Sequence, residues 1–103
     1  AIHAALRSFI AESEWASKTD ESEGAGAVLL VSDHEVTGLE AALTDAQHAY
    51  RSIIAASMHL HLDELNCLLV IGVRGLNKKI KALTKDLAAC RGVKQLKVSF
   101  VKP

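Results

Sequence analysis

The order in which two hydrophobic periodicities follow one another most constrains the fold of this chain. Alternating or continuous short apolar runs predict strands near 28–33, 52–62, 67–75 and 93–101. Apolar residues spaced three or four apart predict helices over 36–51 and 76–91. The order strand, helix, strand, strand, helix, strand is typical of the ferredoxin-like (ACT-like) α+β fold, in which both helices cover one face of an antiparallel sheet.

The N-terminal quarter of the chain differs from this pattern. Residues 1–15 carry an apolar stripe that includes Ile2 and Leu6, which predicts an amphipathic helix. Residues 16–26 are polar, contain glycine and lack periodicity, as expected of a linker. We therefore predict a helix tethered to a separate folded domain over 27–103.

Composition excludes several classes of protein. The 12 basic and 12 acidic residues balance, whereas a free-standing nucleic-acid-binding domain is usually basic. The two cysteines give no sign of a disulfide framework. No apolar run has membrane-spanning length and no signal-peptide pattern opens the sequence. We expect a cytoplasmic protein with no membrane partner.

The stretch HLHLDELNC, residues 59–67, contains three side chains that bind metals. His59 and His61 lie on one face of a strand because side chains alternate along it. A tight turn would place Cys67 opposite His61 on the next strand. Two imidazoles and a thiolate suit nickel(II), copper(II), zinc or cobalt. Two interface histidines beside a buried cysteine would give the same pattern, so both interpretations stay open.

The face of the sheet on which His59 and His61 lie determines which residues could supply a fourth ligand. Its larger apolar set is predicted to face the helices, and it comprises Ile54, Ala56, Met58, Leu60 and Leu62. His59, His61 and Cys67 would then lie on the open face of the sheet, which should be buried against another copy of the chain. His48, on the outer side of the first helix of the domain, could reach them only from a neighbouring subunit.

Four other features receive less specific interpretations. Cys90 falls on the apolar stripe of a helix and should pack in the core, and His3 should be solvated. His34 lies at a strand-to-helix junction, where we expect capping and solvation, with a weak accessory metal site as the alternative. The lysines of the second helix of the domain form either a solvated face or a phosphate contact; they are Lys78, Lys79, Lys81 and Lys85.

The segments DAQHAYRSIIAASMHLHLDELNCLLVIGVRG and RGVKQLKV closely resemble the metal-sensing domain of the nickel-responsive NikR-type transcriptional regulators. That family has a histidine in a QH pair, an HxH pattern eleven residues on, and a cysteine six residues after the second histidine of that pattern. His48, His59, His61 and Cys67 reproduce these intervals. The resemblance implies that these residues bind nickel(II), one ion per subunit, with His48 supplied by a neighbouring subunit.

The resemblance also has implications beyond the metal site. It implies a homotetramer and makes residues 1–15 the last helix of a ribbon-helix-helix domain that binds operator DNA, the rest of which this chain does not contain. The sequence departs from the family at Ala4 and Leu69, where acidic residues are common, and at Tyr50 and Arg51, where histidine is common. Ala4 removes an acidic group for an accessory cation contact, and Leu69 removes a group that would orient the ligands. Tyr50 and Arg51 argue against extra metal sites.

The sequence therefore predicts a nickel-responsive DNA-binding transcriptional repressor, in which metal binding at a subunit interface controls operator binding. Two alternatives remain: a metal-binding oligomer without DNA function, and a small-molecule-binding ACT-like regulatory domain. We do not expect an enzyme, because four protein ligands leave no open position for a substrate.

Overall fold

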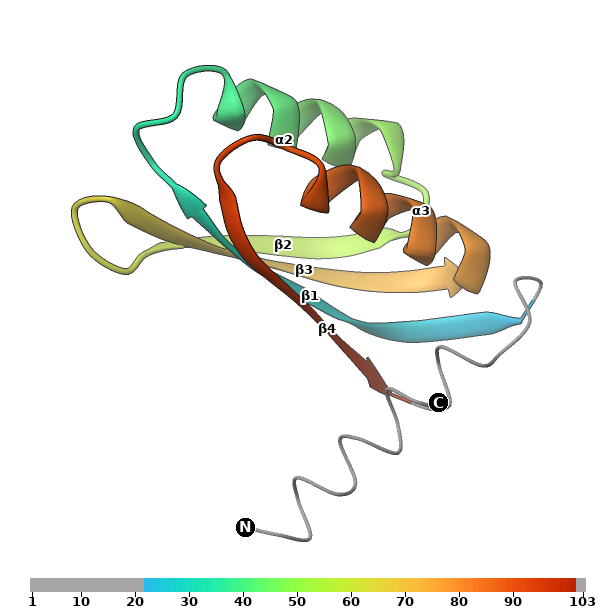
Figure 1. The fold of residues 1–103 in the computed structure, drawn as a ribbon. Helices are drawn as coiled ribbons and strands as arrows, with labels where there is room; N and C mark the ends of the chain where they lie inside the picture. Colours follow the sequence, from blue (N-terminus) through green and yellow to red (C-terminus); the bar gives the residue numbers. More distant parts are fainter. Residues whose placement is uncertain (1–21, 102–103) are drawn as a thin grey trace, which may run out of the picture.

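A computed structural model describes residues 22–101 of the chain, and its element order confirms the predicted fold class. The elements are β1 (Glu23–Asp33), α2 (Leu39–Ala49), β2 (Ile54–His61), β3 (Asn66–Leu76), α3 (Asn77–Ala88) and β4 (Val93–Val101). The antiparallel sheet has the strand order β2-β3-β1-β4, and both helices lie on the same face (Figure 1). The predicted helix over 1–15 lies outside the described residues.

The first strand is longer than expected. β1 begins at Glu23, so residues 23–26, assigned to a linker from their glycines, belong to the sheet. A Cβ at Gly24 would collide with the side chain of Asn77, and one at Gly26 would collide with the backbone of Ser99. These glycines therefore permit close packing inside the domain.

The first helix is shorter than expected, because a turn occupies residues 34–38. Asp33 does not cap the helix; its Oδ1 accepts a hydrogen bond from the Glu35 backbone N–H at 2.9 Å. Gly38 precedes α2 with a positive φ of 84°, a conformation that glycine adopts without steric cost. The turn directs the chain from the sheet to α2 and leaves His34 at the end of β1.

The core lies between the sheet and the two helices. Its buried residues come from every element except β2 and β4, and they are Val28, Leu30, Leu39, Leu43, Ile53, Leu69, Ile71, Val73, Ile80, Leu83 and Leu87. Val28, Leu30 and Ser32 of β1 pair with Ile71, Leu69 and Cys67 of β3, and all six side chains are buried. The inward face of β3 therefore carries Cys67.

The predicted facing of β2 is wrong. Met58 and Leu60, expected to meet the helices, are 56% and 39% exposed, and no residue of β2 is buried. His59 and His61 pair with Leu69 and Cys67, and so lie on the helix-bearing side. The reason is that β2 is an edge strand, whereas α3 packs on β1, β3 and β4. Neither face of this edge strand packs closely on a helix. The face with more apolar residues is therefore not the face that points toward the helices.

Within residues 22–101, no helix is long and apolar enough to cross a membrane.

Candidate metal centre

A tight turn between β2 and β3 fixes the register of the candidate site. Asp63 Oδ1 accepts hydrogen bonds from the backbone N–H groups of Leu65 and Asn66 at 2.8 and 2.9 Å, and from the Asn66 side chain at 3.1 Å. The Asn66 side-chain bond, followed by the two backbone bonds, holds the pKa of Asp63 below its ordinary value. The turn sets His61 directly opposite Cys67, as the sequence analysis expected.

The hairpin places the three donors of HLHLDELNC on one face and brings His61 and Cys67 into contact. His61 Nδ1 lies 3.5 Å from Cys67 Sγ, and the ring centroids of His59 and His61 are 5.4 Å apart. Cys67 is 3% exposed, whereas both imidazoles are exposed to solvent. The thiol therefore forms the floor of the site and the imidazoles form its rim.

The structure adds His34 to this group. Its Nδ1 lies 3.8 Å from Cys67 Sγ, and its ring meets the His61 ring edge-on at a centroid separation of 5.7 Å. The donor atoms of His34, His61 and Cys67 all lie within 4.8 Å of one another. The capping and solvation expected of His34 do not account for this position. Antiparallel pairing of β1 with β3, which sets Ser32 opposite Cys67, was the signal that could have identified it.

His48 lies apart from the cluster, although its helix is on the same side of the sheet. Consecutive helical residues point about 100° apart, and Gln47, the residue before His48, lines the cavity beside the donors. The His48 side chain is exposed. Among residues 22–101, the one group of close donors omits His48 and also His59. The sheet therefore does not separate His48 from the donors, so that prediction is wrong, yet His48 does not reach them within its own chain.

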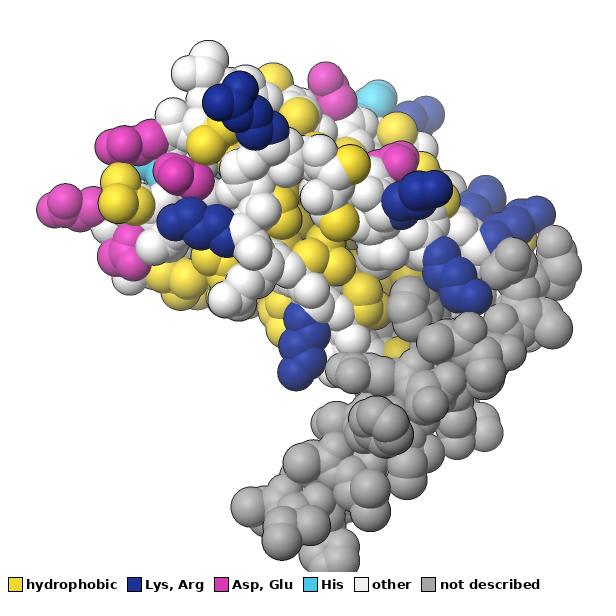
Figure 2. All heavy atoms as spheres, viewed as in Figure 1, with side chains coloured by type: hydrophobic (Ala, Val, Ile, Leu, Met, Phe, Trp, Pro, Cys, Tyr) yellow, Lys and Arg dark blue, Asp and Glu magenta, His cyan; other side chains and the backbone are white. Residues whose placement is uncertain are grey.

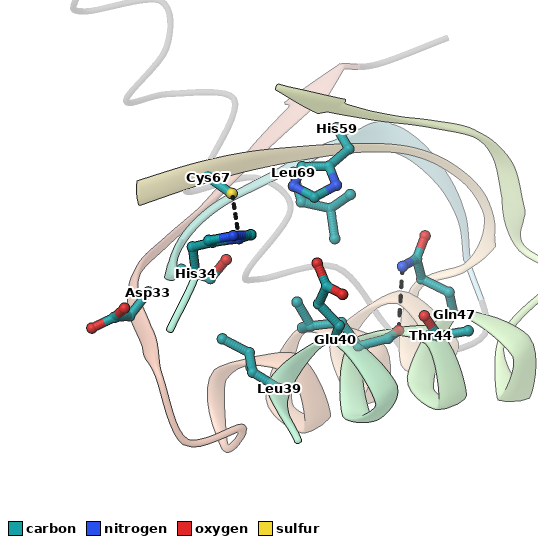
Figure 3. Close-up of a pocket in the computed structure, with 11 residues that line it drawn as sticks. Asp33, His34, Leu39, Glu40, Thr44, Gln47, His59, Cys67 and Leu69 are labelled. Atoms are coloured by element: carbon teal, nitrogen blue, oxygen red, sulfur yellow. Dashed lines mark hydrogen bonds between the residues drawn. The ribbon is translucent and has the colours of Figure 1, made fainter. Parts of the chain in front are cut away.

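A cavity of about 270 Å³ separates α2 from the donors. Cys67, His59 and Leu69 form the strand side, and His34 stands at the end of β1 (Figure 3). On the helix side the carboxylate of Glu40 points into the cavity (Figure 3). The Gln47 amide donates to the Leu43 carbonyl at 3.2 Å. α2 thus presents polar side chains to the donors across an open space.

The donor set fits a borderline transition metal. A thiolate with two or three imidazoles suits nickel(II), copper(II) or zinc and is a poor match for magnesium or calcium, which prefer oxygen ligands. The donor atoms of His34, His61 and Cys67 lie close enough together for one ion to contact all three, and His59 stands outside this group. Fold and site together define a metal-binding domain of the ferredoxin-like α+β class.

Comparison with known proteins identifies the family. Residues 25–101 match the family described as the NikR C terminal nickel binding domain. A protein of Methanocaldococcus jannaschii is 41% identical over 103 residues, covering 100% of this chain and 72% of the relative. A protein of Methanocella arvoryzae is 39% identical over 102 residues, covering 99% and 72%. Both are named "Putative nickel-responsive regulator". The chain belongs to the NikR family.

Solved structures show the same fold at low identity. An uncharacterized protein from Thermotoga maritima matches with a TM-score of 0.71 at 16% identity, over 79% of this chain and 100% of that one. The C-terminal domain of the MgtC protein from Mycobacterium tuberculosis matches with a TM-score of 0.62 at 13% identity, over 82% and 94%. At these identities the likeness concerns the fold alone.

Proposed function

We propose that this chain is the metal-sensing part of a nickel-responsive transcriptional repressor. The observation that carries the proposal is the placement of His59, His61 and Cys67 on one face of a hairpin, with His61 and Cys67 3.5 Å apart, in a member of the NikR family. Such a set would hold one nickel(II) ion per subunit. The ion would supply a common centre to which side chains of different elements can bind.

The chain's own residues would fix the site in three ways. The β2–β3 turn holds the register, so that the thiol and the imidazoles face the same space. Burial of Cys67 protects the thiol from solvent. Leu69, on the floor of the cavity, excludes water from the strand side. Donors arranged before metal arrives lose less conformational entropy on binding.

The fourth ligand would be His48 of a second copy. His48 is exposed on α2 and stands outside the donor cluster of its own chain. The open face of the sheet exposes Met58 and Leu60, which a homotetramer would cover. If ligands come from two chains, metal binding and association stabilise each other, because each favours the same assembled state.

Operator DNA would be bound by a ribbon-helix-helix domain, of which residues 1–15 would be the last helix and residues 16–22 the connection. The names of the relatives support a regulatory role. Metal would bias the attached domains toward one arrangement because it binds the assembled sensor more tightly than the unassembled one.

A mixing experiment tests where the ligands come from. The variants His48→Ala and Cys67→Ala should each lack the nickel–thiolate absorbance band of the parent. When the two are unfolded and refolded together, a chain with intact β-strand donors can meet a chain with an intact His48, so part of the band should return. No recovery in a mixture that assembles like the parent would contradict a shared site.

A binding assay tests the regulatory role. The protein with its upstream domain should bind operator DNA more tightly with nickel than without it. Equal DNA affinity in both states, with normal nickel uptake, would favour a metal-binding oligomer without DNA function. Assembly without any metal uptake would favour a small-molecule-binding domain.

A further inference from the structure

The overall neutrality of the chain conceals a separation of charge. Within the described residues, every Asp and Glu except Asp86 lies in 22–65, and every Lys and Arg except Arg51 lies in 66–101. Carboxylates gather at the end of the molecule that carries the β2–β3 hairpin, whereas several Lys and Arg side chains gather at the α3 end (Figure 2). The basic part of the domain therefore presents a local positive field.

The lysines of α3 are arranged on the side away from the core. Lys78, Lys81 and Lys85 follow one another at three- and four-residue spacing, which places them on one stripe, opposite the buried Ile80, Leu83 and Leu87. Lys78 and Lys85 are exposed and Lys81 is half-buried. Lys79 is also exposed and lies about 100° around the helix from Lys78, beside this stripe. We refer to these four residues as the lysine face.

The charges at the start of α3 differ from those at the start of α2. Lys78 and Lys79 stand in the first turn of α3, which contains no acidic residue. The N-terminal end of a helix carries partial positive charge, so cations there are unfavourable. Like charges three or four residues apart also repel. In α2, by contrast, the first turn carries Glu40, as the dipole favours. An anion at the start of α3 would be attracted both by the helix end and by the lysine charges.

The lysine face adjoins the place where the upstream segment enters the domain. The Asn77 backbone N–H donates to the Ser22 carbonyl at 2.8 Å, and Glu23 pairs with Leu76. The first described residues thus run beside the start of α3. Anything attached upstream begins next to Lys78 and Lys79.

We propose that the lysine face is a contact surface for the phosphate backbone of duplex DNA, independent of base sequence. Lysine ammonium groups suit this task because they meet phosphates as mobile point charges and displace condensed counterions. The biological use of the surface, to hold DNA flanking an operator, rests on the proposed function, whereas its affinity for a polyanion does not.

The salt dependence of DNA binding tests this surface. The full 103-residue chain is titrated onto a random-sequence duplex at several salt concentrations, and the logarithm of affinity is plotted against that of salt. Lys78→Gln/Lys85→Gln should weaken binding and reduce the slope by up to about 0.9 for each lost phosphate contact. Lys78→Arg/Lys85→Arg should keep the parent's slope. An unchanged slope in the Gln variant overturns the proposal.

A matched control separates local contact from net charge. Arg74→Gln/Lys97→Gln removes the same charge from exposed residues of β3 and β4, on the face of the sheet away from the helices, and should leave the slope near the parent's. An equal fall of the salt slope in both double variants would overturn the proposal, since the change in net charge alone would then explain the result. Lower assembly of the α3 variant in size-exclusion chromatography, with an unchanged slope, would assign the lysine face to contacts between copies and also overturn it.

Nickel absorbance on the same samples distinguishes this inference from the proposed function. If the Gln variant has a normal nickel band and an unchanged salt slope, the lysine face does not contact DNA and the proposed nickel-sensing function still stands. If the Gln variant has a reduced salt slope and neither it nor the parent shows a nickel band, the DNA contact of the lysine face is supported and the nickel-sensing function is contradicted.

Discussion

The two helices lie side by side on one sheet but are packed very differently. α3 buries Asn77, Ile80, Leu83 and Leu87, whereas α2 buries only Leu39 and Leu43. α3 rests on β1, β3 and β4, and α2 stands over a cavity that reaches to β2 and β3. The candidate metal donors lie on the loosely packed side. One half of the domain thus supplies stability, and the other keeps open the space in which ligands can meet.

The largest expected effect compares a leucine from each helix. Leu83→Ala, at a fully buried site of α3, should lower the free energy of unfolding by about 2–5 kcal/mol. Leu43→Ala should fall at the lower end of that range, because Leu43 already borders the cavity and loses fewer contacts. Urea unfolding of both variants measures the difference. A larger loss for Leu43→Ala would contradict the assignment of stability to α3.

The next comparison concerns two histidines that line the cavity beneath α2. If His59 is a ligand and His34 only orients Cys67 and His61, His34→Ala should weaken nickel binding by about 10–100-fold, the usual effect of removing a group that supports the ligands. His59→Ala should weaken it further. Competition with a chelator at fixed pH gives both affinities. The reverse order would place His34 in the ligand set instead of His59, which its place among the close donors permits.

The sequence predicted most of the fold because the pattern of β1, β3 and α3 is set by a core that they share. The intervals from His59 to His61 and Cys67 depend only on alternation and a tight turn, so their common face was also predictable. The facing of β2 was not, since Met58 and Leu60 are exposed on an edge strand. His34 was undervalued for a related reason: its nearness to Cys67 arises from the pairing of β1 with β3, which no local pattern encodes.

A smaller effect compares the loops that flank the helices. Gly38, before α2, has a φ of 84°, and a Cβ added there would meet nothing within 4 Å. Gly38→Ala should therefore cost only the backbone strain, about 1–2 kcal/mol. Gly92, after α3, has a φ of 103°, and a Cβ there would press on Leu39 and Val36, so Gly92→Ala should cost more. Thermal unfolding measures both, and equal losses would show that the loop after α3 relaxes as freely as the loop before α2.

The smallest expected effect lies where the two halves meet. The hydroxyl of Tyr50, at the end of α2, donates to Asp86 of α3 at 2.5 Å. This hydrogen bond, then partial loss of hydration and the negative charge of Asp86, raise the pKa of Tyr50 above its ordinary value of 10.0. A raised pKa favours the neutral phenol in the folded state. The bond therefore contributes fully below about pH 10 and is lost as pH rises through the raised value.

Because Tyr50 is the chain's single tyrosine, the ultraviolet absorbance of phenolate reports its titration directly. The midpoint should lie above that of the unfolded chain and return toward it in Asp86→Asn, where the carboxylate charge is gone. Tyr50→Phe should reduce stability slightly at neutral pH, and the difference from the parent should shrink once the phenol ionises. A midpoint that Asp86→Asn leaves unchanged would mean that the two helices are not joined by this bond in solution, and that α2 is held by apolar packing alone.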